Sequence, residues 1–318
     1  MRGVIALVGP TAVGKTDVSI ELAKRLEAEI VGCDSMQVYR RMPILSQQPT
    51  AAQLAQVTHH VMNCVEPTDT FNVGQYRRLA LEAIADIHAR GKTALLVGGS
   101  GMYLKTLTHG FCEAPPEDAH IRTRLFLVAE EQGSPALHER LRSVDPAAAS
   151  KIHPHDARRV VRALEVYEST GRPLSRLWSE AAEAAVPMTV LGLARGREAL
   201  CARINDRVVR MMREDGVLDD ARQVSALGLS RTARQVHGLR FLDAYLNGER
   251  SLEETITLWQ QQVRQYARRQ MTWFRADARI RWLTLDAHDS IQLVCDHLAG
   301  LLGTPTHRSP SWNAPSSS

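Results

Sequence analysis

The chain has 318 residues, a hydrophobic content of 44% and a formal net charge of +4. These values fit an ordinary soluble protein with one large domain plus an insertion, or with two domains. No apolar run approaches the roughly 18 residues of a membrane span, and five cysteines without a C-x-x-C pair argue against a disulfide framework or a zinc site. With a first strand expected from about Gly3, leaving no room for an export leader, we expect a cytoplasmic protein.

The N-terminal third of the sequence alternates strand and helix patterns. We expect strands at 3–8, 29–33 and 93–97, and helices at 15–27 and 73–90. Strands that are separated by helical patterns imply a parallel sheet with covering helices. The expected fold class is therefore α/β.

Beyond this third the sequence pattern becomes helical, and the positions where the pattern changes predict the domain boundaries. The N-terminal part of the α/β core should cover residues 1–111, and a mostly helical insertion should cover 112–186. The core should resume over 187–302, because "PMTVLGLA" reads as one more buried strand. Residues 303–318 are polar and rich in Pro and Ser, so we expect a disordered tail.

The stretch "GPTAVGKT" has the spacing G-x-x-x-x-G-K-[ST], which is typical of a phosphate-binding loop. It follows a β-branched run and precedes an amphipathic helix, which argues against a chance match in a turn. Its backbone N–H groups would surround an anion, Lys15 would add a charge, and the Thr16 hydroxyl would reach Mg²⁺. The expected phosphate-binding residues are Gly9, Pro10, Thr11, Ala12, Val13, Gly14, Lys15 and Thr16.

Asp34 comes where the second expected strand ends, in "AEIVGCDSMQVY". Ligands of open α/β sheets bind at this carboxyl edge, beside the phosphate loop. The carboxylate could hold Mg²⁺, act as a general base, or only cap the next turn. The later strand in "TALLVGGSGMY" ends in Gly98 and Gly99 with no acid, which makes an ordinary nucleoside triphosphatase less favoured.

The stretch from Trp259 to Trp282, "WQQQVRQYARRQMTWFRADARIRW", predicts a basic helix. Trp259, Val263, Tyr266 and Trp273 recur at helical spacing, so we expect this face to pack into the core. The arginines beside it could form a solvated surface or follow a phosphate backbone. Further upstream, "IHPHD" offers two histidines and an acid, but a metal site there is disfavoured because no third spaced ligand follows.

The ordered set of motifs resembles the tRNA dimethylallyltransferase (tRNA isopentenyltransferase) family, in its bacterial form. The matching stretches are "GPTAVGKT", "DSMQVY", "HHV…EPTDTFNVGQY", "GGSGMY", and "DARRVVRALEVYESTGRP" followed by "VRQYARRQMTWFR". The resemblance implies a P-loop kinase-like core with a helical, tRNA-binding insertion. It also implies transfer of a dimethylallyl group from dimethylallyl diphosphate to N6 of adenosine 37, in tRNAs that read codons starting with U.

The resemblance assigns roles to residues of this chain. Lys15, the loop amides and Mg²⁺ on Thr16 would stabilise the departing diphosphate together with an arginine, for which we favour Arg207 over Arg203. Asp34 would accept a proton from the adenine amine, or orient it. Contacts with the tRNA are implied for Asp34, Ser35, Met36, Gln37, Ser100, Arg158, Arg159, Val160, Val161, Arg162, Gln235, Val236, His237, Gly238, Leu239 and Arg240.

The sequence departs from the family pattern in two places. "ILSQQP" stands where the family usually reads I-G-T-A-K-P, so Gln48 replaces a lysine, and His237-Gly238-Leu239 replaces I-G-Y. Both departures concern RNA contact rather than the diphosphate loop. The expected partners are the anticodon stem-loop of tRNA and dimethylallyl diphosphate, with no membrane, and the expected state is a monomer. Alternative functions are prenylation of a free adenine nucleotide, a kinase activity, or RNA binding without catalysis.

Overall fold

The computed structural model describes residues 3–111, 115–182, 185–286 and 288–303. The disordered tail expected at 303–318 therefore lies outside the described residues except for Gly303. The chain divides into two compact units. The first consists of residues 1–70, 83–99 and 188–318, and the second of residues 71–82 and 100–187. Within the described residues no helix has the length and apolarity needed to cross a bilayer.

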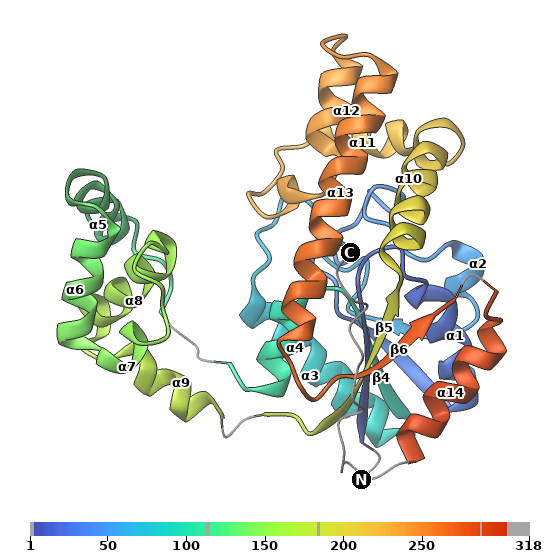
Figure 1. Ribbon diagram of the computed structural model, residues 1–318, viewed down its shortest axis with the longest axis horizontal. Helices are drawn as coiled ribbons and strands as arrows, with labels where there is room; N and C mark the ends of the chain where they lie inside the picture. The colour runs from blue at the N-terminus through green and yellow to red at the C-terminus, as the bar shows by residue number, and fades with distance from the viewer. Residues whose placement is uncertain (1–2, 112–114, 183–184, 287, 304–318) are drawn as a thin grey trace, which may run out of the picture. The chain divides into compact units, whose positions relative to one another are not determined.

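A six-stranded parallel sheet forms the centre of the first unit (Figure 1). Its strands lie in the order β3-β2-β4-β1-β5-β6. Their bounds are β1 Val4–Val8, β2 Ala28–Gly32, β3 His59–His60, β4 Thr93–Gly98, β5 Met188–Arg195 and β6 Arg281–Leu285. This confirms the predicted α/β class with a parallel sheet.

The apolar sequence of β1 explains its central place, because a strand of a parallel sheet that is covered on both faces has no polar side. Ala6, Leu7 and Val8 have no exposed surface. In the register, Val8 pairs with Gly98 of β4 on one side and with Gly192 of β5 on the other. The loop that follows Val8 is thereby placed at the carboxyl edge, between two neighbouring strands.

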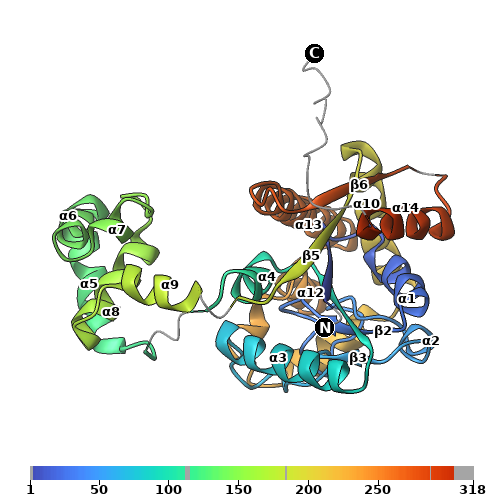
Figure 2. The ribbon, with the colours of Figure 1, turned by 90° about the horizontal axis from the view of Figure 1, so that it is seen from below.

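The helices of the first unit pack around this sheet and against one another. Wholly within it are α1 Lys15–Arg25, α2 Ala51–Leu54, α10 Arg197–Arg213, α11 Val217–Ser225, η1 Ala233–Gln235, α12 Leu239–Leu246, α13 Leu252–Arg275 and α14 Ile291–Gly303. Helices α1 and α14 pack together beside the sheet (Figure 2), and α10 packs along α13. A capping box of Ser251 and Glu254 starts α13, since each residue satisfies the other's backbone N–H.

The second unit is mainly a bundle of short helices: α5 Ala119–Gln132, α6 Ser134–Val144, α7 Pro146–Ala149, α8 Ala157–Thr170 and α9 Leu174–Ala182. Leu125, Leu141, Val160 and Leu164 belong to its own hydrophobic core. The unit also includes α4 Gly101–Thr108 and the start of α3 Val73–Ala89. The insertion boundaries expected at residues 112 and 186 stay a prediction.

The structure corrects the expected basic helix. Helix α13 ends at Arg275, and Arg281 and Trp282, the last two residues of the stretch from which we predicted the basic helix, instead begin the edge strand β6. Strand β6 is five residues long and mostly half-buried, so it carries neither the apolar run nor the clear alternation that identifies strands. The expected packing of the apolar face is confirmed, with Trp259 and Val263 buried and Tyr266 and Trp273 half-buried.

Candidate active site

The loop from Gly9 to Gly14 joins β1 to α1 at the carboxyl edge of the sheet. Two glycines are required by its geometry. Gly9 has φ +152°, and a Cβ there would lie 2.5 Å from the Leu193 carbonyl oxygen. Gly14 has φ +111° and is the N-cap of α1. The loop therefore ends at a helix N-terminus, where backbone N–H groups and the helix dipole favour an anion.

Lys15 is the first residue of α1, and its ammonium group folds back over the loop. Its Nζ donates hydrogen bonds to the carbonyl oxygens of Gly9 at 3.0 Å and Pro10 at 2.9 Å. Burial lowers the pKa of Lys15 to about 8, while the charge of Asp34 opposes that shift and the charge of Arg207 adds to it. Lys15 is thus still mainly charged at neutral pH, and a bound anion would stabilise that charge.

Three arginines donate hydrogen bonds to successive residues of the loop. Arg195 Nε reaches the Val13 carbonyl at 3.0 Å, Arg203 Nε reaches the Ala12 carbonyl at 2.9 Å, and Arg207 Nη2 reaches the Thr11 hydroxyl at 2.9 Å. Arg195 ends β5, and the other two lie on α10 one turn apart. The sequence pointed to Arg203 or Arg207, and both reach the loop.

Arg207 has the properties of an anion ligand. Its Nε is buried and has no hydrogen-bond partner within the described part of the chain. Burial, followed by the charges of Arg210 and Arg203, lowers its pKa to about 10. An anion in the loop would give the Arg207 Nε a hydrogen-bond partner. It would also reduce the repulsion among these cations. The preference for Arg207 over Arg203 as the diphosphate ligand stays a prediction.

Asp34 follows β2 at the same edge of the sheet and is half-buried. Its Oδ1 accepts a hydrogen bond from Met36 N at 2.9 Å, so the carboxylate does cap the next turn. It also lies close enough to Lys15 to raise the pKa of that lysine. The capping bond orients the carboxylate without removing its charge, so capping and catalysis are compatible roles.

Helix α13 supplies Gln270, which the sequence interpretation did not single out, and Tyr266, which it named only as part of the apolar face. Gln270 is buried, its Oε1 accepts from Thr11 N at 2.9 Å, and its Nε2 donates to Gly99 O at 2.9 Å. Tyr266, one turn earlier, has its pKa raised by burial and by the charge of Asp34. A polar residue on the apolar face of the helix, four residues after Tyr266, was the signal available in the sequence.

The segment after Asp34 contains the first expected tRNA-contact residues. Ser35, Met36 and Gln37 are half-buried. Gln48, which stands where the family has a lysine, donates through Nε2 to Tyr39 O at 2.7 Å and to Gln37 O at 3.2 Å. Its neutral amide therefore holds this segment by its backbone, which is a role that does not need a cation.

The expected tRNA-contact residues 235–240 differ in how much of each side chain reaches the surface. Gln235 and Arg240 are exposed, whereas Val236 and Leu239 are buried. The His237 ring lies 4.1 Å from the Tyr266 ring, measured between centroids. Burial, with the charges of Arg269 and Arg240, lowers the pKa of His237 to about 4, so this histidine is neutral. Gly238 N donates to Gln262 Oε1 at 3.0 Å.

The second unit carries the other expected tRNA-contact residues. On α8, Arg158 and Arg159 are exposed, while Val160 and Val161 are buried in the core of the unit. Arg162 is half-buried and donates to Glu165 Oε2 at 2.9 Å and to the Pro115 carbonyl at 2.6 Å. Ser100 is the N-cap residue of α4. No group of three or more potential metal-binding His, Cys, Asp or Glu side chains occurs in the described residues.

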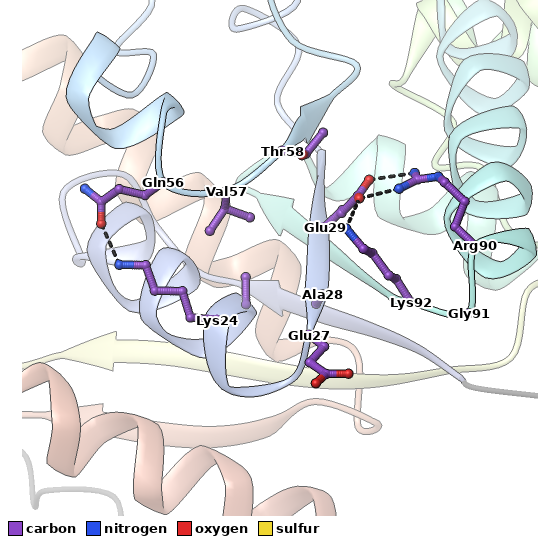
Figure 3. Close-up of a pocket in the computed structure, with 11 residues that line it drawn as sticks. Lys24, Glu27, Ala28, Glu29, Gln56, Val57, Thr58, Arg90, Gly91 and Lys92 are labelled. Carbon is purple, nitrogen blue, oxygen red and sulfur yellow. Dashed lines mark hydrogen bonds and ion pairs between the residues drawn. The ribbon is translucent and has the colours of Figure 1, made fainter.

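A cavity of about 530 Å³ lies at the opposite edge of the sheet, near the starts of β2 and β4 (Figure 3). It is lined by Ala23, Lys24, Glu27, Ala28, Glu29, Gln56, Val57, Thr58, Arg90, Gly91 and Lys92. The buried Glu29 carboxylate pairs there with Arg90, with Lys92 at 2.8 Å and with His60 at 2.7 Å. Since its charges are already paired with one another, we interpret this cluster as a structural tie between β2, β3 and the turn that joins α3 to β4.

The fold and the site define a class of protein: a phosphate-loop enzyme with an α/β core whose loop is surrounded by cations. A family model described as IPP transferase matches residues 37–277, and the chain belongs to that family. The tRNA dimethylallyltransferase of Syntrophobacter fumaroxidans is 44% identical over 92% of this chain and 85% of that protein. A tRNA dimethylallyltransferase of Citrifermentans bemidjiense is 43% identical over 88% and 91%.

Solved structures of the same kind are also similar. The tRNA isopentenylpyrophosphate transferase of Bacillus halodurans is 37% identical, with a TM-score of 0.68 over 95% of this chain and 97% of that one. A eukaryotic dimethylallyltransferase that acts on tRNA is 28% identical, with a TM-score of 0.77 over 97% of this chain and 81% of that one. These relatives confirm the family that the motifs indicated.

Proposed function

We propose that this enzyme transfers a dimethylallyl group from dimethylallyl diphosphate to N6 of adenosine 37 in tRNAs that read codons starting with U. The products are N6-(dimethylallyl)adenosine and diphosphate. The observation that carries the proposal is that Asp34 follows β2 at the same edge of the parallel sheet as the loop after β1, where its charge acts on Lys15. A proton acceptor and an anion site thus lie together, as displacement of diphosphate by an amine requires.

The loop and the cations around it stabilise the leaving group. The allylic C–O bond breaks, its electron pair stays with the diphosphate oxygen, and positive charge develops on carbon. Lys15, Arg207 and the loop N–H groups stabilise the growing negative charge. Lys15 must turn from the Gly9 and Pro10 carbonyls toward the anion, and the Arg207 Nε gains the partner that it lacks.

Asp34 acts on the acceptor amine as its proton acceptor. The adenine nitrogen forms the new C–N bond, and its proton passes to the Asp34 carboxylate. Because the target base is normally stacked, it has to leave the stack before N6 can reach the carbon. Gln48 holds the backbone at Tyr39, in the segment that follows Asp34, and Gln270 holds it at Thr11 in the loop. Both amides hold these backbone segments without adding charge.

Thr16, the second residue of α1, offers a hydroxyl oxygen at the end of the loop, the kind of donor that Mg²⁺ takes. The Thr16 hydroxyl would hold it, and the ion would offset charge on the departing diphosphate. The described residues contain no three-ligand cluster of metal-binding side chains, which suits an ion that binds mainly through substrate oxygens and water. The monomeric state and the cytoplasmic location expected from the sequence stay predictions.

The test is to compare acceptors. Purified protein is incubated with Mg²⁺, dimethylallyl diphosphate and either an anticodon stem-loop with adenosine 37 or AMP. We expect the stem-loop to be modified and AMP to remain unmodified. Modification of AMP in preference to the stem-loop would identify an enzyme of free nucleotides, and ATP-dependent phosphorylation of either acceptor would identify a kinase.

A further inference from the structure

Arg195 contacts the phosphate loop from outside, and neither the motifs nor the family resemblance singled it out. It is the last residue of β5 and is half-buried. Its Nε donates to Val13 O at 3.0 Å and its Nη1 donates to Asp286 O at 2.9 Å. A Cβ placed on Gly14 would lie 4.0 Å from its Nη2. The guanidinium plane therefore spans the loop and the chain that leaves β6.

The direction of these bonds matters for anion binding. In a planar trans peptide the C=O and the following N–H point in opposite directions. Because the Val13 carbonyl points at Arg195, the Gly14 N–H points away from it. Arg203 Nε holds the Ala12 carbonyl in the same way. Carbonyls that are held outward cannot turn toward an anion and repel it.

We propose that Arg195 is a positioning residue for the diphosphate site, fixing the Val13–Gly14 peptide so that its N–H is aimed into the loop. The proposal rests on the proposed function, because it takes diphosphate as the ligand of the loop. Two directed bonds to backbone carbonyls distinguish this role from general attraction of an anion, for which any exposed cation would serve. Arginine suits the role because its rigid fork donates along several fixed directions, whereas lysine is a point charge on a flexible stem.

The experiment measures binding of inorganic diphosphate by the full chain with Arg195→Ala, Arg195→Lys and the control Arg213→Ala. Arg213 is exposed in the last turn of α10, so its loss removes one charge from the same unit without changing the loop. We expect Arg195→Ala to weaken diphosphate binding about ten-fold, the order of one lost hydrogen bond that involves a charged group. kcat/KM for dimethylallyl diphosphate should fall at least as much, while the Kd for stem-loop RNA stays unchanged.

The lysine variant decides between position and charge. If Arg195 acts by position, Arg195→Lys binds diphosphate nearly as weakly as Arg195→Ala. Wild-type affinity in Arg195→Lys would overturn the proposal and leave only a charge effect. A lowered Tm with unchanged diphosphate affinity in both variants would likewise overturn it, since that is the result of a purely structural contact. Failure of the wild-type protein to bind diphosphate at all would instead contradict the proposed function.

Discussion

Replacing Asp34 with asparagine removes the proposed proton acceptor and leaves the local geometry intact. Asp34 Oδ1 accepts a hydrogen bond from Met36 N at 2.9 Å, and an asparagine amide oxygen can accept the same bond. The turn after β2 should therefore keep its shape. Without the charge, single-turnover transfer to the stem-loop should fall by about 10²–10⁴, the usual effect of a lost general base.

The same change should act on Lys15, and this second effect has a pH signature. The pKa of Lys15 is about 8, and Asp34 raises it against the effect of burial. In Asp34→Asn the pKa of Lys15 falls further, so more of this lysine is neutral at pH 8 than in the wild type. Because lysine is charged below its pKa, lowering the pH to 6 should restore the Lys15 contribution. The deficit in kcat/KM should thus be larger at pH 8 than at pH 6, and should persist at both.

The assay is single-turnover transfer across a Mg²⁺ series, with a melting curve for each variant. Asp17→Asn is the matched control, because it removes an exposed carboxylate from the first turn of α1, beside the loop. If high Mg²⁺ restores the transfer activity of Asp34→Asn, Asp34 is a metal ligand. If the variant loses thermal stability but keeps normal turnover, Asp34 only caps the turn after β2. Transfer within about threefold of the wild type would refute the base assignment, because the expected loss is far greater.

Three other predictions follow from the described contacts. Lys15→Ala should lower turnover about 10²–10³-fold and leave the Kd for tRNA unchanged, and near-normal turnover at saturating substrate would contradict its role. Arg158→Ala and Arg159→Ala should each reduce the slope of log Kd against log salt by somewhat less than one unit, and a salt-independent affinity would assign both residues to a solvated surface. Arg162→Ala should mainly lower Tm, because Arg162 pairs with the buried Glu165. Glu29→Gln should destabilise the fold by about 1–3 kcal/mol at pH 7, less than for a fully buried pair because Arg90 and Lys92 are partly exposed. The paired cations lower the pKa of Glu29 in the folded protein. Its contribution to folding stability is therefore complete above about pH 4.3, the pKa of glutamate in an unfolded chain, and is lost on acidification. A difference in Tm between wild type and variant that is the same at pH 3 as at pH 7 would contradict this.

Local patterns predicted the parts of the site that lie close together in the sequence. The strand–loop–helix around Gly9–Thr16 has its own spacing signature, and the position of Asp34 at a strand end follows from the periodicity of one short segment. Parallel strands then bring both to the same edge of the sheet. These inferences need no knowledge of long-range packing, so the sequence was sufficient for them.

The residues that the sequence did not identify reach the loop from distant parts of the chain. Gln270 follows Thr11 by 259 residues, and Arg195 follows Val13 by 182. Arg195 looks ordinary at the end of its strand, and the only local signal for Gln270 is its polar side chain on the apolar face of the helix. Only the packing of α13 and the pairing of β1 with β5 bring them to the loop. Strand β6 was missed for a related reason. It is an edge strand without a clear strand pattern of its own, and only its pairing with β5 identifies it.

The most direct test of the central claim is the stoichiometry of one reaction. Wild-type protein, Mg²⁺, dimethylallyl diphosphate and an anticodon stem-loop are combined without ATP, and the nucleoside at position 37 is analysed by mass while released diphosphate is counted. We predict that adenosine 37 gains one dimethylallyl group at N6 for every diphosphate released, and that a stem-loop with guanosine at position 37 gains none. Release of diphosphate without modified adenosine, or modification that requires ATP, would contradict the account.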